Sequence, residues 1–236
     1  MRIPVHVAVP AVLLLALSAC SVPQRAGDEP GLRASLTTPT DIDLSWREEE
    51  PQPAGHGLEF ATEESGPWTV LQYLPAGVRT YRHPDLMPHT TFFYRLRAFD
   101  GPVSAPLTVA LPQGGMTKAD EDSSHTWLPA RKDPGRVVPG RPLAGSGAGA
   151  PTGFKAVVKH ANGILFTWTD HASDEAGFLL EARTRGGSEY EPLVVLDPDV
   201  NSTGLITLPT EKEASYRVRA FRHGELSNVV RLTTGE

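Results

Sequence analysis

The sequence contains a single cysteine, Cys20, and this scarcity limits both the chemistry and the stabilisation of the chain. One thiol cannot form an internal disulfide, so we expect stability to come from core packing. The sequence also lacks C-x-x-C, G-x-S-x-G and H-E-x-x-H motifs and a glycine-rich phosphate-binding loop. The eight histidines are scattered along the chain. We therefore predict a protein that is not an enzyme, with no catalytic residues and no cofactor.

Positive charge is also scarce. The formal net charge is −6, and the sequence has no block of consecutive basic residues of the kind that binds nucleic acid. Nucleic acid is therefore excluded as an expected partner. Pro and Gly are abundant and long apolar periodic stretches are few, which disfavours a helical bundle and favours small β domains.

The one long apolar run lies at the start of the chain. Arg2 precedes an apolar stretch from Ile3 to Leu17 that is too short to span a bilayer as a helix but is typical of a secretory signal. It ends in Leu17-Ser18-Ala19-Cys20, which resembles the lipobox of bacterial lipoproteins. A conventional signal peptide, with Cys20 as a free thiol, is the alternative.

The lipobox resemblance implies an export signal and a lipid anchor. It makes residues 1–19 a lipoprotein signal peptide and residues 20–30 a tether, with Cys20 carrying diacylglycerol. The expected location is the bacterial cell envelope, with the protein held on the outer membrane by its lipid. Because several acyl chains anchor a protein stably, the membrane is an expected partner.

The chain contains an internal repeat with an offset of 122 residues. Ile42-x-Leu44-x-Trp46 superimposes on Ile164-x-Phe166-x-Trp168, and Tyr94–Phe99 superimposes on Tyr216–Phe221. A fixed offset of this kind indicates two copies of one structural unit. Apolar residues alternate with polar ones in both segments, which is the period of half-buried β-strands.

The repeated segments resemble the fibronectin type III domain, a seven-stranded β-sandwich. Trp168 to Glu181 is similar to strand B, the BC loop and strand C of bacterial members, and Tyr216 to Phe221 is similar to their strand F. The resemblance implies an all-β fold of two immunoglobulin-like sandwiches, at residues 31–112 and 151–236, each an independent unit. The implied structural core residues are Trp46, Tyr94, Trp168 and Tyr216.

A segment rich in Gly, Pro, Ser and charge separates the two copies. Residues 113–150 show no strand or helix period, so we predict a disordered, flexible linker. Trp127 is the exception, because a tryptophan in a polar linker is most often docked on a neighbouring domain. A recognition motif is the alternative for this residue.

Charged and aromatic residues repeat on strand F of both copies. Alternation places the arginines on the face away from the core, opposite Glu59 and Glu181 of strand C, where we expect a cross-strand ladder. A ligand-facing arginine surface is the alternative, with Phe99 and Phe221 closing the row as exposed aromatics. The candidate interface residues are Arg95, Arg97, Phe99, Arg217, Arg219 and Phe221.

The best acidic cluster is in the second BC loop. Asp170, Asp174 and Glu175 could in principle coordinate calcium through oxygen. The interpretation we adopt is that such side chains hold turn geometry by binding backbone amides, so no metal site is predicted. His171 is expected to be an exposed loop residue.

These patterns predict a membrane-anchored extracytoplasmic lipoprotein that presents two fibronectin type III modules for protein binding, adhesion or scaffolding. A protein partner of unknown identity is expected. One alternative is a structural spacer or accessory subunit of a cell-envelope complex for secretion or motility. Another is a carbohydrate-targeting accessory module, although the sequence offers no obvious row of aromatics for one.

Overall fold

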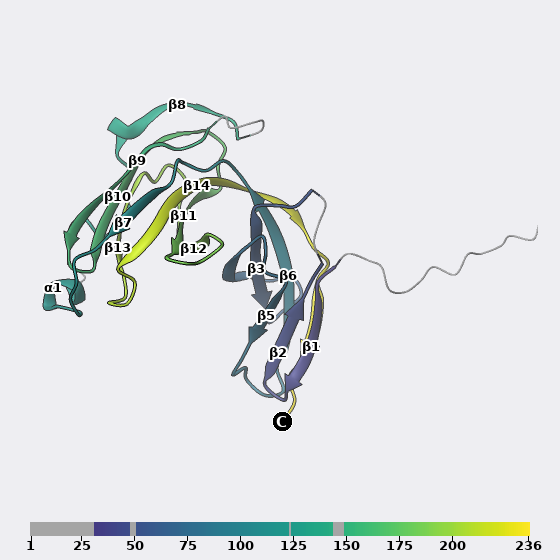
Figure 1. The fold of residues 1–236 in the computed structure, drawn as a ribbon. Helices are drawn as coiled ribbons and strands as arrows, with labels where there is room; N and C mark the ends of the chain where they lie inside the picture. Colours follow the sequence, from purple (N-terminus) through teal and green to yellow (C-terminus); the bar gives the residue numbers. More distant parts are fainter. Residues whose placement is uncertain (1–30, 48–50, 123, 144–148) are drawn as a thin grey trace, which may run out of the picture.

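The chain forms two β lobes joined into an arch (Figure 1). The computed structural model describes residues 31–47, 51–122, 124–143 and 149–236, so Cys20 and the lipobox residues Leu17, Ser18 and Ala19 lie outside the described part. Within these ranges no helix is long and apolar enough to cross a membrane. The fold is all-β, as the sequence predicts.

The first lobe is a sandwich of a three-stranded and a four-stranded layer. Its first layer has the order β1-β2-β5, and its second layer has the order β4-β3-β6-β15, with all neighbours antiparallel. The bounds are β1 Arg33–Thr38, β2 Asp41–Ser45, β3 Gly55–Ala61, β4 Thr69–Pro75, β5 Thr80–His83, β6 Thr91–Asp100 and β15 Val230–Thr233.

The second lobe repeats this arrangement. One layer pairs β9 and β13 with β10, and the other has the order β12-β11-β14-β7. The bounds are β7 Leu107–Ala110, β9 Thr152–His160, β10 Gly163–Ala172, β11 Gly177–Thr184, β12 Glu191–Leu196, β13 Ser202–Ile206 and β14 Glu213–Leu226.

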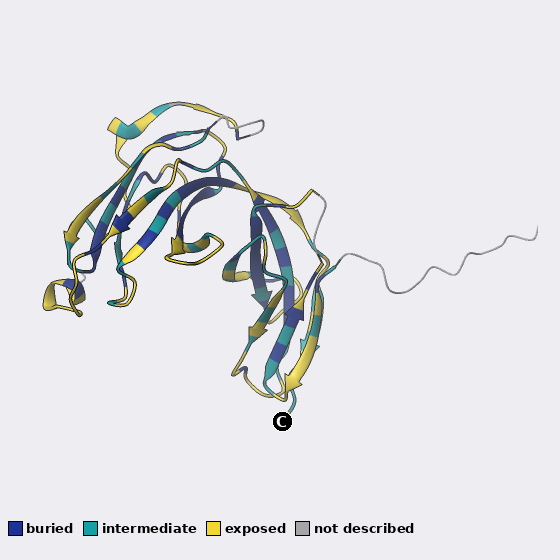
Figure 2. Cartoon of the chain, viewed as in Figure 1, coloured by how far each residue is buried: buried dark blue, intermediate teal, exposed yellow. Residues whose placement is uncertain are grey.

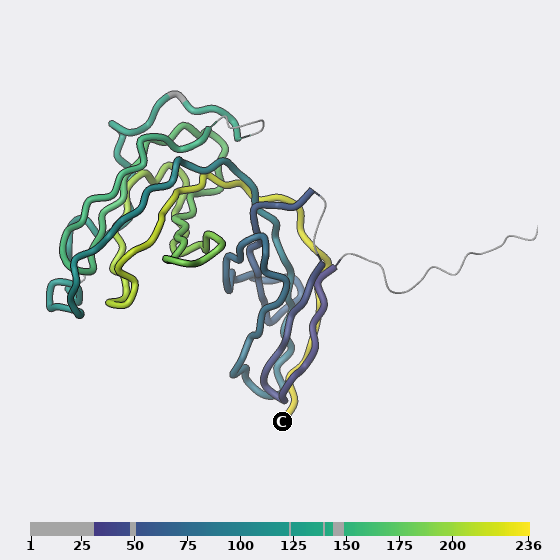
Figure 3. The backbone as a smooth tube through the Cα atoms, in the orientation of Figure 1, coloured from purple at the N-terminus to yellow at the C-terminus, as the bar shows by residue number. Residues whose placement is uncertain are grey.

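The two lobes exchange their last strands. β7 follows the first copy in sequence but pairs with β14 of the second lobe, in the register Tyr216↔Leu107. β15 ends the second copy but pairs with β6 of the first lobe, in the register Val230↔Tyr94. Figure 3 shows the chain leaving the first lobe after β6 and returning to it after β14.

The exchange differs from the predicted boundaries of 31–112 and 151–236. Each sandwich is completed by a strand from the other copy, so neither copy closes by itself. The physical reason is that β14 runs on past its own lobe and pairs with β6, which carries the chain end across the junction. The two sandwiches are therefore one connected body.

Both cores are built from the repeated strand positions. Ile42, Leu58 and Tyr94 are fully buried in the first lobe, and Trp46 lies at its edge with 7% of its surface exposed. Their counterparts Ile164, Leu180, Tyr216 and Trp168 are buried in the second lobe. Buried positions alternate with intermediate ones along β10, whereas β3 and β11 are buried along most of their length (Figure 2).

The described part of residues 113–150 differs from the predicted disordered linker. It contains α1 (Lys118–Glu121), η1 (Pro134–Arg136) and β8 (Val137–Arg141), and β8 pairs in parallel with β10. Its backbone also bonds to β13, because the Arg131 amide donates to the Ser202 carbonyl at 2.8 Å. This segment docks through isolated contacts and not through an apolar face, which explains why its sequence shows no strand or helix period.

Trp127 is docked on the second lobe, as the favoured interpretation expects. Its ring stacks on His125 with centroids 5.2 Å apart and meets His160 of β9 at 5.4 Å. Beside it, the buried carboxylate of Asp120 accepts hydrogen bonds from the Asn162 amide and side chain. Polar contacts thus hold the linker where hydrophobic patterning gives no signal.

Candidate functional site

The candidate site is the junction of the two lobes, where β14 meets β6. Arg222 pairs with Asp100, and His223 pairs with Phe99, so the sheet continues from one lobe into the other. Phe99 and Phe221 lie in T-shaped contact with ring centroids 5.9 Å apart. Tyr73 contacts both rings at 5.7 Å. The two copies of the repeat therefore contact each other here through the equivalent residues Phe99 and Phe221.

Phe99 and Phe221 differ from the prediction that they are exposed, because each is only 1% exposed. With Leu179 they form a small core of their own, separate from the two sandwich cores. Strand alternation predicts their outward direction correctly, but it cannot reveal that the other lobe covers the outer face. The two rings therefore form a contact between the lobes of one chain.

Two glycines make the close packing of these rings feasible. A Cβ on Gly55 would lie 2.4 Å from the Phe99 ring, and a Cβ on Gly177 would lie 3.3 Å from the Phe221 ring. Each such Cβ would also lie within 2.3 Å of a backbone carbonyl, that of Leu74 or Leu196. Sequence reasoning missed these glycines and Tyr73, although the equal offset from Gly55 to Gly177 was a usable signal.

The arginine row forms two internal ladders. Glu59 accepts hydrogen bonds from Arg95 and, at 2.9 Å, from Arg97. Glu181 accepts from Arg217 and, at 2.7 Å, from Arg219. The favoured interpretation of the row as a cross-strand ladder matches this pairing.

Burial makes the second ladder more than a surface feature. Glu181 is 2% exposed and Arg219 is 8% exposed, and Arg219 also donates to the Gly101 carbonyl at 2.7 Å. Arg95 and Arg217 lie 4.0 Å from the centroids of the Trp68 and Tyr190 rings. The arginines are thus bound within the protein rather than presented to a ligand.

An apolar groove lies beside the junction, between the edge strands β4 and β12. It encloses about 390 Å³ and is lined by uncharged residues of both lobes. Val70, Leu193 and Val195 are its exposed apolar side chains, with 41%, 48% and 48% of their surfaces accessible. Burial raises the pKa of Tyr73 at its inner end, and Glu59 raises it further. Because residues of both lobes line the groove, it exists only while the lobes are held together.

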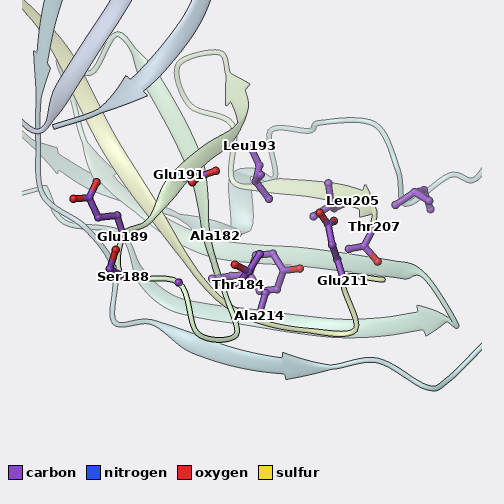
Figure 4. Close-up of a pocket in the computed structure, with 13 residues that line it drawn as sticks. Ala182, Thr184, Ser188, Glu189, Glu191, Leu193, Leu205, Thr207, Glu211 and Ala214 are labelled. Carbon is purple, nitrogen blue, oxygen red and sulfur yellow. The ribbon is translucent and has the colours of Figure 1, made fainter. Parts of the chain in front are cut away.

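A second cavity opens in the second lobe, between its two layers (Figure 4). It encloses about 430 Å³, and its lining includes Leu205 and Tyr216. Burial raises the pKa of Tyr216 to about 12, and Glu211 contributes to this rise. Glu189 and Glu211 both line the cavity and lie apart in the view of Figure 4. The cavity combines an apolar wall with acidic groups.

The structure divides the predicted acidic cluster. Asp174 accepts a hydrogen bond from the amide of Leu143 at 2.7 Å, so it holds the docked linker and not its own turn as the sequence suggests. Asp170 accepts a hydrogen bond from the Ala172 amide at 2.9 Å, which is the turn-holding role expected from the sequence. Asp170 and Glu175 also gather with Asp199, which no sequence pattern gives a reason to include. His171 is expected in an exposed loop, but it lies in β10 with intermediate burial, and its imidazole pairs with the Thr152 hydroxyl at 2.7 Å.

No protein-family model matches the chain, and the search of curated proteins finds no significant match. Among solved structures, the chain is similar to a two-domain fibronectin type III segment of chicken tenascin, at 16% identity and a TM-score of 0.27. That match covers 89% of this chain and 100% of that one. The FN1-FN3 domains of chicken CNTN1 match at 16% identity and a TM-score of 0.27, covering 88% of this chain and 67% of that one.

These matches are too weak to assign the fold, which is assigned from the strand order instead. Each lobe packs three antiparallel strands on a four-stranded layer, in the arrangement of immunoglobulin-like sandwiches. In the second lobe β8 adds a fourth, parallel strand to the β10 layer. The chain is therefore an all-β protein of two fibronectin type III-like sandwiches.

Proposed function

We propose that this protein is a membrane-anchored scaffold that holds two β-sandwiches in a fixed arrangement and contacts a protein partner through the groove between them. The observation that carries the proposal is the exchange of β7 and β15. Two sandwiches connected only by a flexible linker would move independently, whereas exchanged strands tie each lobe to the other.

The groove supports the choice of a protein partner. Val70, Leu193 and Val195 expose apolar surface on both sides of it, and charged residues do not line it. Contact surfaces between proteins are depleted of charge at their centres. The carbohydrate alternative has less support, because none of the exposed large hydrophobic side chains in the described ranges is aromatic.

The spacer alternative shares the rigid arch but needs no contact in the groove. A photo-crosslinking residue at Val195 in the lipid-anchored protein separates the two functions. We expect it to form discrete adducts with a protein, because Val195 faces the groove. The same residue at Val229, which is 45% exposed outside the groove, is the control and should form none.

Adducts that require Val195 and disappear when Leu193→Asp is introduced would support the binding scaffold. Adducts of equal pattern from both positions would contradict a groove-specific contact. Absence of adducts from both would favour the spacer.

Membrane anchoring rests on Leu17-Ser18-Ala19-Cys20 and is tested separately. The Cys20→Ser protein should lose acyl labelling and leave the membrane fraction, because the thiol that carries the lipid is gone. Ser21→Ala, next to the modified position, is the control and should remain in the membrane fraction. Membrane retention of Cys20→Ser without detergent would refute the anchor.

A further inference from the structure

Three carboxylates, from one strand and two connecting segments, meet at one end of the second sandwich. Asp170 lies near the end of β10, Glu175 lies in the β10–β11 loop, and Asp199 lies in the β12–β13 turn. One oxygen from each lies within 4.8 Å of the others. Asp170 and Glu175 are buried and Asp199 is exposed, so the cluster is open on one side.

Asp170 has an oxygen with no partner. Its Oδ1 accepts a hydrogen bond from the Ala172 amide at 2.9 Å, while its Oδ2 is inaccessible and has no hydrogen-bond partner among the described residues. Asp170 is 1% exposed, so solvent does not compensate this oxygen. A buried carboxylate oxygen without a partner destabilises the folded protein unless a positively charged group or ion binds it.

The acidic groups of the cluster outnumber the positively charged groups around them. Burial raises the pKa of Asp170, the hydrogen bond from the Ala172 amide lowers it, and repulsion from Glu175 and Asp199 raises it further. Lys132 pairs with Asp199 at 2.9 Å on the exposed side. In the described ranges, no ion pair reaches Asp170 or Glu175. The inner two carboxylates therefore lack a cationic partner.

We propose that Asp170, Glu175 and Asp199 bind one calcium ion. The donors are all carboxylate oxygens, which suit a hard cation and not a soft one such as zinc. Magnesium is usually held by one or two carboxylates together with several waters, whereas calcium accepts more protein carboxylates in flexible geometry. In this proposal the ion supplies the missing partner of the Asp170 Oδ2 and binds one oxygen of each of the other two carboxylates.

The first copy provides an internal comparison. At the offset of 122 residues, the positions of Glu175 and Asp199 hold Pro53 and Gly77. The turn is nevertheless the same in both copies, because the amide of Val78 bonds to Pro75 as that of Val200 bonds to Asp197. In the second copy Glu175 accepts a hydrogen bond from the Asp199 amide at 3.1 Å. The first copy keeps the same turn without either carboxylate, which supports a role for them beyond turn geometry.

A bound ion would also fix the docked linker. Val137 of β8 pairs with Asp170, and the neighbouring Lys132 contacts Asp199. Calcium at this position would join the end of β10, which pairs with β8, to the β10–β11 loop and the β12–β13 turn. Its binding should therefore stabilise the folded protein by mass action.

Calorimetric titration of residues 20–236 carrying Cys20→Ser tests the site. We expect one calcium ion per chain, and an affinity at least about tenfold lower in Glu175→Gln and in Asp199→Asn. Asp197→Asn is the matched control, because Asp197 is an exposed carboxylate two residues from Asp199 and outside the cluster. Its affinity should be unchanged.

Thermal unfolding keeps the test decisive if a variant is unstable. Calcium should raise the Tm of the parent relative to EDTA, while Asp170→Asn should melt in EDTA at or above the parent and show no rise with calcium. No saturable binding up to about 10 mM calcium would overturn the proposal. Unchanged affinity in Glu175→Gln and Asp199→Asn would also overturn it, and equal affinity for magnesium would overturn the choice of calcium.

Discussion

Removal of residues 227–236 is expected to unfold the first sandwich, although these residues end the second copy. β15 packs Val230 and Leu232 against the first core, and Asn228 exchanges two hydrogen bonds with Leu32. Losing two partly buried side chains and these bonds should cost about 3 to 6 kcal/mol. That is comparable to the whole stability of a small domain.

Hydrogen exchange followed strand by strand measures this result. Amide protection should disappear in β2, β3 and β6 and persist in β10, β11 and β13. The reciprocal control is Val109→Asp in β7, which belongs to the first copy in sequence but packs in the second core. That variant should lose protection in the second sandwich. If the truncation instead exposes β11 and β14, then β15 closes its own copy and the exchange is refuted.

Arg219→Glu is expected to reduce the free energy of unfolding by about 3 to 5 kcal/mol, because it breaks a buried ion pair and leaves like charges together. Arg219 and Glu181 are almost inaccessible and are bonded at 2.7 Å. The sequence pattern by itself predicts an exposed ladder and a cost below about 1 kcal/mol. The difference arises because the other lobe covers this face.

Arg185→Glu is the matched control for this substitution. Arg185 pairs with Glu213 at 3.1 Å, but the arginine side chain is 81% exposed, so its reversal should cost no more than about 1 kcal/mol. Urea denaturation of both variants gives the comparison. Equal midpoints would show that burial does not strengthen the Glu181–Arg219 pair.

The sandwich fold and most of its core were predictable from local patterns. Alternation in the segments around Trp46 and Trp168 places these side chains on the inner face, and the structure buries both. The ladder partners of Glu59 and Glu181 follow from the same alternation, because residues directly opposite on adjacent strands interact. Such features depend only on neighbours within one strand pair.

The acidic cluster was only partly predictable. Asp170 and Glu175 lie close together in the sequence, but Asp199 comes from a turn that reaches them only in the folded sandwich. Likewise, Asp174 points to Leu143 of the docked linker, which no period or motif indicates. Contacts between distant segments made by single residues leave no repeating signal in the sequence.

The sequence alone determined that this chain is β-rich, repeated and built on two tryptophan cores, because strand period and offset are local properties. Only the tertiary structure decided which last strand completes which sandwich. Segments such as Leu107–Ala110 and Val230–Thr233 have similar alternating patterns and suit either β6 or β14. The choice is made by the continuation of β14 into β6 and by the burial of Phe99 against Phe221, both of which exist only once the two lobes meet.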